Sequence, residues 1–186
     1  RLRGLVLSLA ADDPYWPQLP CAVDSRIQRA EGGTERADSV FNALLRLEEL
    51  GAEANDWVLV HDAARPNLAR ADLDNLLAAL ADDPVGGLLA VPARDTLKRI
   101  GADGRVKETV DRSVIWQAFT PQMFRRHQLV RALQQASAAG VEVTDEAMAM
   151  ERLGLRPLLV ECAEDNFKIT TPADLARFEF ELSRRA

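Results

Sequence analysis

Cysteine is scarce in this sequence, which has 186 residues and two cysteines, Cys21 and Cys162. Their wide separation does not match the ligand spacing of a structural zinc site, and a disulfide-stapled fold needs more cysteines. We expect both side chains to be buried as small apolar groups in a protein of the reducing cytoplasm.

Long apolar runs and an excess of positive charge are also missing. No stretch approaches the roughly 20 apolar residues that a membrane-spanning helix needs, and no signal-peptide pattern opens the printed chain. The formal net charge is −6 at pH 7, so neither a membrane nor a nucleic acid is an expected partner. A small phosphorylated ligand remains compatible, because a few local cations suffice to bind it.

Common catalytic motifs are absent as well. The dinucleotide fingerprint G-x-G-x-x-G does not occur, which argues against a dehydrogenase. Neither paired carboxylates nor a Ser-His-Asp set stands out, so acid–base and covalent catalysis are not favoured.

Short β-like runs alternate with longer helical patterns, which predicts a layered α/β fold with a mainly parallel sheet in one domain, residues 1–186. The last helix begins with Thr171 as N-cap, Pro172 as its first residue and Asp174 three positions after the cap. We expect strands at 5–9, 26–29, 57–60, 85–91, 156–162 and 166–170, and earlier helices at 39–50, 70–80, 126–139 and 144–153.

A densely charged segment interrupts this rhythm between residues 94 and 112. Its Gly101-Ala102-Asp103-Gly104 sequence is typical of a turn between two extended segments. We expect a hairpin arm at about 94–120. It has little apolar surface of its own, so it needs a partner to pack on; taken alone, it is equally an exposed hairpin with weak ion pairs.

The sequence His61-Asp62-Ala63-Ala64-Arg65-Pro66 directly follows the expected strand at 57–60. Ligands of parallel α/β sheets bind beyond the carboxyl ends of the strands. Asp62 is therefore placed for a metal ion and Arg65 for a phosphate, although an isolated Asp after a strand is also an ordinary turn residue. We expect His61 to point away from this site and assign it no catalytic role.

Two further segments favour phosphate or nucleotide chemistry. Gly32 and Gly33 open a turn into a helix, where glycine lets the backbone approach a flat ligand; a plain strand-to-helix turn has the same pattern. Alternation over residues 166–170 places Asn166, Lys168 and Thr170 on one face. A lysine there is either solvated or directed into a cleft, where it neutralises phosphate.

These segments together resemble the 2-C-methyl-D-erythritol 4-phosphate cytidylyltransferases. The resemblance covers essentially the whole chain and rests on the stretches GGTERADSV, WVLVHDAARP, ARDTLKR, TVDRSVIW, FTPQMF, VTDEA and NFKITTPADL. It implies a Rossmann-like three-layer nucleotidyltransferase domain and a homodimer in which the β-arms are exchanged. A partner subunit would then cover the arm.

The resemblance also implies roles for individual residues. Gly32, Gly33, Thr34 and Ser39 would bind the nucleotide, while Arg36 braces their turn. Asp62 would hold Mg²⁺ and act in catalysis with Arg112 and Lys168. The polyol phosphate would be bound by six residues: Ala63, Arg65, Thr96, Arg112, Thr144 and Lys168. Of these, Thr96 and Arg112 would come from the partner's arm, and Thr144 serves equally well as a helix N-cap.

The implied reaction forms 4-diphosphocytidyl-2-C-methyl-D-erythritol and pyrophosphate from CTP and 2-C-methyl-D-erythritol 4-phosphate, in non-mevalonate isoprenoid biosynthesis. Family members open with a strand, a glycine-rich loop carrying Arg and Lys, and a helix, none of which is in the printed sequence. We therefore expect the polypeptide as printed to be inactive or nearly so, because such loops hold phosphates.

Two alternatives remain open at this point. One is a cytidylyltransferase for another polyol phosphate, such as ribitol 5-phosphate; Lys98 and the sequence around Arg112 look more like the methylerythritol enzymes. The other is a non-catalytic dimeric scaffold. Five residues with an intact site pattern argue against the scaffold, because a protein that has lost its activity has no reason to keep them all: Asp62, Arg65, Thr96, Arg112 and Lys168.

Overall fold

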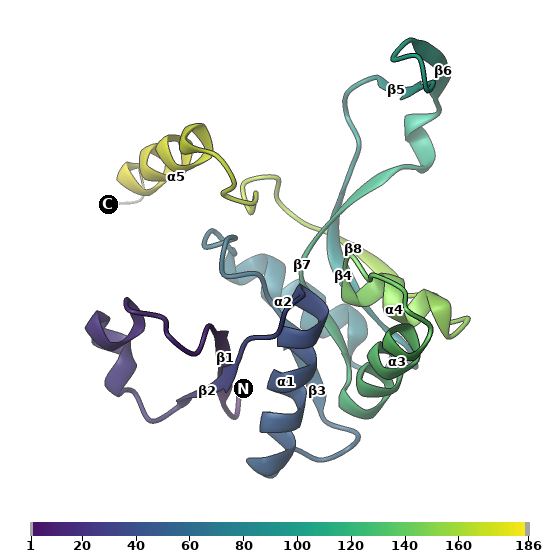
Figure 1. Cartoon of the computed structure of the whole chain (residues 1–186). Coiled ribbons are helices and arrows are strands. Elements are labelled where there is room, and N and C mark those ends of the chain that lie inside the picture. The colour runs from purple at the N-terminus through teal and green to yellow at the C-terminus, as the bar shows by residue number, and fades with distance from the viewer. Residues whose placement is uncertain (1, 185–186) are drawn as a thin grey trace. The chain divides into compact units, whose positions relative to one another are not determined.

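The computed structural model describes residues 2–184, in which helices alternate with strands along the chain (Figure 1). This alternation confirms the predicted α/β class. The chain forms two compact units: one combines the part up to Val58 with Phe124–Arg156, and the other combines Leu59–Met123 with the part from Pro157 onwards. The chain passes from one unit to the other within β3 (Trp57–Val60), within β7 (Trp116–Arg125) and again between Arg156 and Pro157.

In the first unit, the parallel strands β1 (Leu5–Leu9) and β2 (Ile27–Glu31) pair over their full length. Helix α1 (Arg36–Glu49) packs on both strands and on α3 (Arg126–Ala138), and its Leu44 is buried. The helix begins three residues earlier than predicted, because a Glu35–Asp38 capping box satisfies its first backbone N–H groups.

Two more helices, α3 (Arg126–Ala138) and α4 (Glu146–Arg152), complete the first unit by packing against each other. Leu129 and Met150 are fully buried there. Short 3₁₀ turns, η1 (Trp16–Gln18) and η2 (Pro20–Val23), form the connection between β1 and β2. Cys21 lies in this connection and is exposed, so the expectation that it is buried was wrong.

In the second unit, strands β4 (Gly86–Pro92) and β8 (Leu158–Glu161) are parallel neighbours, and α2 (Arg70–Leu80) covers them. They belong to a four-stranded sheet of order β3-β7-β4-β8. A side chain at Gly87 would come within 2.1 Å of the Leu158 carbonyl oxygen, so glycine is required at this position.

The expected hairpin is present as the antiparallel strands β5 (Leu97–Ile100) and β6 (Val106–Val110). In Figure 1 the hairpin is drawn at the top of the view, joined to an extended connection from β4 and, through η3, to β7. The backbone φ of Gly104 is +75°, a value that suits glycine in the turn. The 3₁₀ turn η3 (Arg112–Val114) follows the hairpin.

The last helix, α5 (Pro172–Ser183), begins as predicted, because Thr171 and Asp174 form a reciprocal capping box. Cys162, just after β8, is half-buried, and its burial raises the pKa of the thiol to about 12. Among residues 2–184, no helix has the length and apolar character that a membrane span requires.

Candidate active site

A compact charge cluster forms where the chain leaves β3. The Asp62 Oδ2 atom lies 3.1 Å from the Lys168 ammonium and 3.8 Å from Arg65 Nε. The side chains of Asp62 and Arg65 are 13% and 11% exposed, whereas that of Lys168 is 43% exposed. The structure therefore brings together three of the charged residues that the sequence indicated, all within the second unit.

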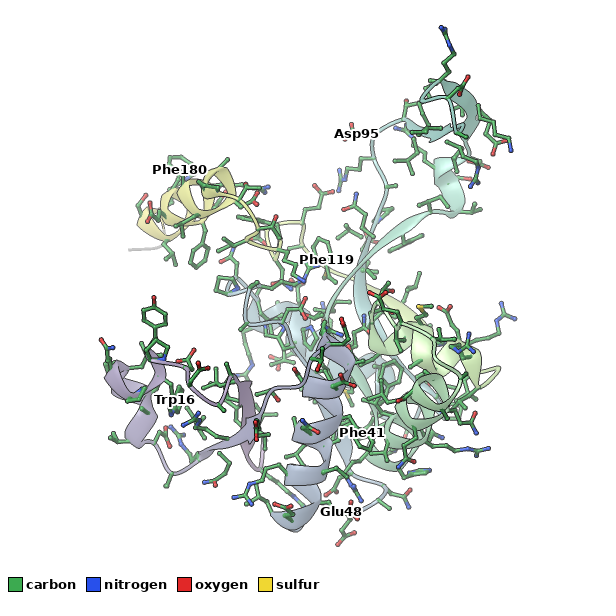
Figure 2. All side chains as sticks on the ribbon, viewed as in Figure 1. Trp16, Phe41, Glu48, Asp95, Phe119 and Phe180 are labelled. Atoms are coloured by element: carbon green, nitrogen blue, oxygen red, sulfur yellow. The ribbon has the colours of Figure 1, made fainter. Side chains whose placement is uncertain are left out.

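The two cations of this cluster differ in how firmly they are held. The Arg65 guanidinium donates to the Asn166 carbonyl oxygen at 3.0 Å and lies 4.5 Å from the centre of the Phe119 ring, labelled in Figure 2. The Lys168 side chain is 43% exposed, so water can reach and screen its ammonium, whereas the Arg65 side chain is only 11% exposed. A phosphate can therefore compete for the Lys168 ammonium, while Arg65 stays in place.

A hydrogen-bond network fixes the backbone around Asp62. The Thr120 hydroxyl accepts the Asp62 N–H at 3.1 Å and lies 2.9 Å from His61 Nδ1. Because the Arg65 carbonyl oxygen can only accept, His61 Nε2 carries a proton and donates to it at 2.9 Å. In the neutral ring Nδ1 has no proton, so it accepts from the Thr120 hydroxyl. His61 thus supports the loop as a neutral imidazole.

The pKa of His61 is consistent with this assignment. Loss of water around the ring lowers the pKa below its usual value, although the backbone contact at Arg65 and the charge of Asp62 act in the opposite direction. The role of the ring as a link between β7 and the loop was not apparent from the sequence, because Thr120 is 59 positions away.

The segment that carries Lys168 is not the predicted strand. Residues 166–170 lie in an irregular connection between β8 and α5, and Asn166 is fully buried whereas Lys168 is exposed. One backbone hydrogen bond, from the Ile169 N–H to the Ala64 carbonyl oxygen at 2.8 Å, holds the segment together with several side-chain hydrogen bonds. These bonds take the place of strand pairing, so the alternation was misleading.

The other residues that the resemblance assigns to the polyol phosphate are exposed. Ala63 lies in the turn after Asp62, and Thr96 lies at the base of the arm, next to Asp95, labelled in Figure 2. Arg112 lies in η3, where it donates to the Arg94 carbonyl oxygen. Thr144 precedes α4, but the N-cap of that helix is Asp145, so the capping explanation for Thr144 was wrong.

The glycine turn lies in the first unit, between β2 and α1. The Gly32 N–H donates to the Leu9 carbonyl, and the Gly33 N–H donates to Ser39 Oγ at 3.0 Å. A side chain at Gly33 would come within 2.1 Å of Asp38 Cβ, which explains the glycine. Gly33 and Thr34 are exposed, so this turn offers an open surface at the start of α1.

A buried ion pair anchors that turn. Arg36, the first residue of α1, makes two hydrogen bonds of 2.6 and 3.0 Å with the carboxylate of Glu146, which is 1% exposed. Burial raises the pKa of Glu146, and the nearby Arg36 guanidinium opposes that rise. The sequence indicated that Arg36 braces the turn, but it did not reveal Glu146 as its partner.

The donor set at Asp62 fits Mg²⁺ and does not fit an all-protein metal cage. The described residues contain no cluster of three or more His, Cys, Asp or Glu side chains able to hold a metal ion. Mg²⁺ is commonly bound by one or two carboxylates together with waters and substrate phosphates. A single, partly accessible carboxylate beside two cations meets that requirement only when phosphate oxygens complete the coordination.

Comparison with known proteins gives consistent matches over nearly the whole chain. A family model for 2-C-methyl-D-erythritol 4-phosphate cytidylyltransferase matches residues 1–184. A curated protein of that name from Pseudomonas aeruginosa is 68% identical over 178 residues, which is 96% of this chain and 76% of the relative.

Solved structures agree with this match. A crystal structure of 4-diphosphocytidyl-2C-methyl-D-erythritol synthase has a TM-score of 0.84 at 38% identity, covering 95% of this chain and 81% of the other. The Francisella tularensis 2-C-methyl-D-erythritol 4-phosphate cytidylyltransferase has a TM-score of 0.84 at 33% identity, covering 96% and 80%. The similarity therefore extends to both units of the chain.

Proposed function

The chain belongs to the 2-C-methyl-D-erythritol 4-phosphate cytidylyltransferase family, and from that premise we propose that Asp62, Arg65 and Lys168 form the phosphate-binding part of its active site. The enzyme is a nucleotidyltransferase that forms 4-diphosphocytidyl-2-C-methyl-D-erythritol and pyrophosphate from CTP and 2-C-methyl-D-erythritol 4-phosphate. A different polyol phosphate and a non-catalytic scaffold are not favoured by these relatives.

The chemistry of this reaction explains why cations are needed and a general base is not. The attacking phosphate oxygen of the polyol substrate is already anionic at neutral pH, and it displaces pyrophosphate from the α-phosphorus of CTP. The main barrier is the approach of two anions and the charge that develops in the transition state. Arg65 and Lys168 are the groups that reduce this barrier, Arg65 as a fixed cation and Lys168 as a movable one.

We propose that Asp62 is the protein ligand of Mg²⁺. The ion, when bound, neutralises charge on the nucleotide phosphate oxygens. The contact between Asp62 and Lys168 supports this assignment, because it places a carboxylate beside the cation around which phosphates would gather.

The remaining site residues enter the same proposal. Nucleotide binding is assigned to the turn and the following helix, where Gly33 and Thr34 give an exposed surface: Gly32, Gly33, Thr34 and Ser39. Polyol phosphate binding is assigned to Ala63, Thr96, Arg112 and Thr144 in addition to the charge cluster. We propose a cytoplasmic homodimer in which Thr96 and Arg112, itself catalytic, act from the partner's arm.

The observation that carries the proposal is the 3.1 Å contact between Asp62 and Lys168, and two variants test it. Turnover of every variant is measured in a form of the protein that also carries the family's glycine-rich loop, because the polypeptide as printed is expected to be inactive or nearly so. In that form K168M is expected to lower kcat by about 10²–10³-fold, the effect of losing one group that stabilises the transition state. D62N is expected to abolish the increase in CTP affinity that Mg²⁺ produces in the unaltered chain. Pyrophosphate release and calorimetric CTP titrations measure the two effects.

Matched controls separate these effects from general changes of charge. Lys107 on β6 and Asp82 after α2 are exposed, so K107M and D82N are expected to behave as the unaltered chain in both measurements. Equal turnover of K168M and K107M would contradict the assignment of Lys168.

A further inference from the structure

Asn166 connects three parts of the second unit, although it carries no charge. Its side chain is fully buried, and its Nδ2 group donates to the Thr120 carbonyl of β7 at 2.8 Å. Its own backbone carbonyl accepts the Arg65 guanidinium at 3.0 Å. One residue thus links β7, the loop after β3 and the segment that ends in Lys168.

The Lys168 segment depends on such links, because the connection between β8 and α5 contains no helix or strand. Asn67, which is 2% exposed, provides a second link by donating from Nδ2 to the Asp165 carbonyl at 2.8 Å. Two asparagines therefore hold the chain just before Lys168, and the Ile169 N–H bond to Ala64 holds it just after.

Stability alone gives a poor account of Asn166. Its Oδ1 atom is buried and has no hydrogen-bond partner in the part of the chain that the structure describes. Burying a polar atom without a partner opposes folding. The buried Oδ1 atom of Asn166 therefore opposes folding, whereas its Nδ2 group makes a favourable hydrogen bond to the backbone of β7, next to the charge cluster.

We propose that Asn166 is a positioning residue for catalysis, with Asn67 as its support. By holding the 165–169 segment against β7, it places the Lys168 ammonium beside Asp62 and keeps the Arg65 guanidinium in its present orientation. This inference rests on the proposed function, in which Lys168 and Arg65 act on the reacting phosphates.

A double-mutant cycle tests the inference. N166L is expected to lower kcat/KM by about 10²-fold, the loss that a displacement of about 1 Å at a reacting group produces. In a K168M background the same substitution is expected to have a much smaller effect, because the residue it positions is already absent. Pyrophosphate release is measured for all four proteins, with thermal unfolding followed by circular dichroism.

A core substitution in the same unit provides the control. Leu76 in α2 is fully buried, and L76A lowers the melting temperature without touching the cluster. Its effect on kcat/KM is expected to be small and equal in the two backgrounds. If the losses of kcat/KM caused by N166L and by K168M simply multiply in the double variant, Asn166 acts only through general stability and the proposal is overturned.

The remaining outcomes are also decisive. If N166L does not fold, N67A is placed in the same cycle and is expected to show a smaller loss that again depends on Lys168. If neither variant folds, the two asparagines hold the fold itself, and the positioning role is overturned. A K168M protein with full activity overturns the proposed function and this inference together, whereas an active N166L beside an inactive K168M overturns the inference alone.

Discussion

Arg36 and Glu146 lie 110 positions apart, yet their side chains form an ion pair with two hydrogen bonds, and the Glu146 carboxylate is buried. Such a pair contributes little net stability, because removing the carboxylate from water offsets most of the attraction. Its main effect is geometric: it fixes the first residue of α1 and with it the turn that starts at Gly32.

We expect E146Q to lower the free energy of unfolding by about 1–3 kcal/mol, since the guanidinium loses its charged partner. CTP binding should weaken by about tenfold, while the KM for the polyol phosphate stays unchanged. Denaturant unfolding and CTP titration measure these effects, and E151Q, at an exposed position of the same helix, is the control. Unchanged CTP affinity in E146Q would mean that the turn does not need this anchor.

At the residue scale, the sequence predicted the charge cluster but not its supports. Asp62 and Arg65 share a short motif after a strand. Lys168 was indicated first by the alternation over residues 166–170 and then by the resemblance. Glu146 and Asn166 were missed as supports because their partners are distant in the sequence. Arg36 is 110 positions from Glu146, and Arg65 and Thr120 are 101 and 46 positions from Asn166. Short sequence spacing carries no information about such contacts.

Among the elements, α5 has the most complete start signal. The Asp174 carboxylate accepts hydrogen bonds from the backbone and side chains of Thr170 and Thr171. These bonds, the Thr170 backbone bond first among them, lower the pKa of Asp174 from 3.8 to about 2.

The consequence for α5 depends on pH in a defined direction. Because the folded pKa of Asp174 is depressed, its stabilising effect is complete above pH 3.8 and is lost as the pH falls toward 2. An NMR titration of the Asp174 carboxyl carbon should give a midpoint near 2, and T171V should raise that midpoint. A midpoint of 3.8 in the unaltered chain would contradict the capping geometry.

Two element predictions failed for opposite reasons. The strand β7 was missed, because Pro121 lies within it and proline normally argues against the interior of a sheet. Residues 166–170 were predicted as a strand, because polar and apolar residues alternate there. Alternation describes which side chains face a core, but it does not show whether a neighbouring strand is available for backbone pairing.

On the scale of the whole molecule, the arm leaves apolar side chains in solvent. Ile100, Val106 and Val114 are 67%, 65% and 74% exposed. Under the proposed homodimer, a partner subunit would cover this surface, as exposed apolar side chains that lie together often mark an interface.

Sedimentation measurements should therefore show a dimer for the unaltered chain. The double variant I100D/V106D should shift it toward the monomer, because burying two carboxylates in an apolar interface is costly. Leu175 on α5 is an exposed leucine outside the arm, so L175D should leave the mass unchanged. A monomeric unaltered chain, or a dimer that tolerates both charges, would argue against assembly through the arm.

At this scale the sequence predicted the α/β class, because alternation is a property of consecutive residues. It did not predict that the chain divides into two units, each made of two separated stretches. Which stretches pack together depends on long-range contacts such as those of α3 with α1. The prediction of a single nucleotidyltransferase domain stays a prediction.

The separation between Arg36 and Glu146 has a consequence for biosynthesis. A ribosome that adds about 5–20 residues per second needs roughly 5–20 s to translate the 110 residues between them. During that interval the turn that starts at Gly32 has been made, but the Glu146 carboxylate that anchors it has not. The turn can reach its final conformation only after α4 leaves the ribosomal exit tunnel. A pause in translation between Arg36 and Glu146 would therefore prolong the time in which the part of the chain already made is exposed to chaperones and proteases.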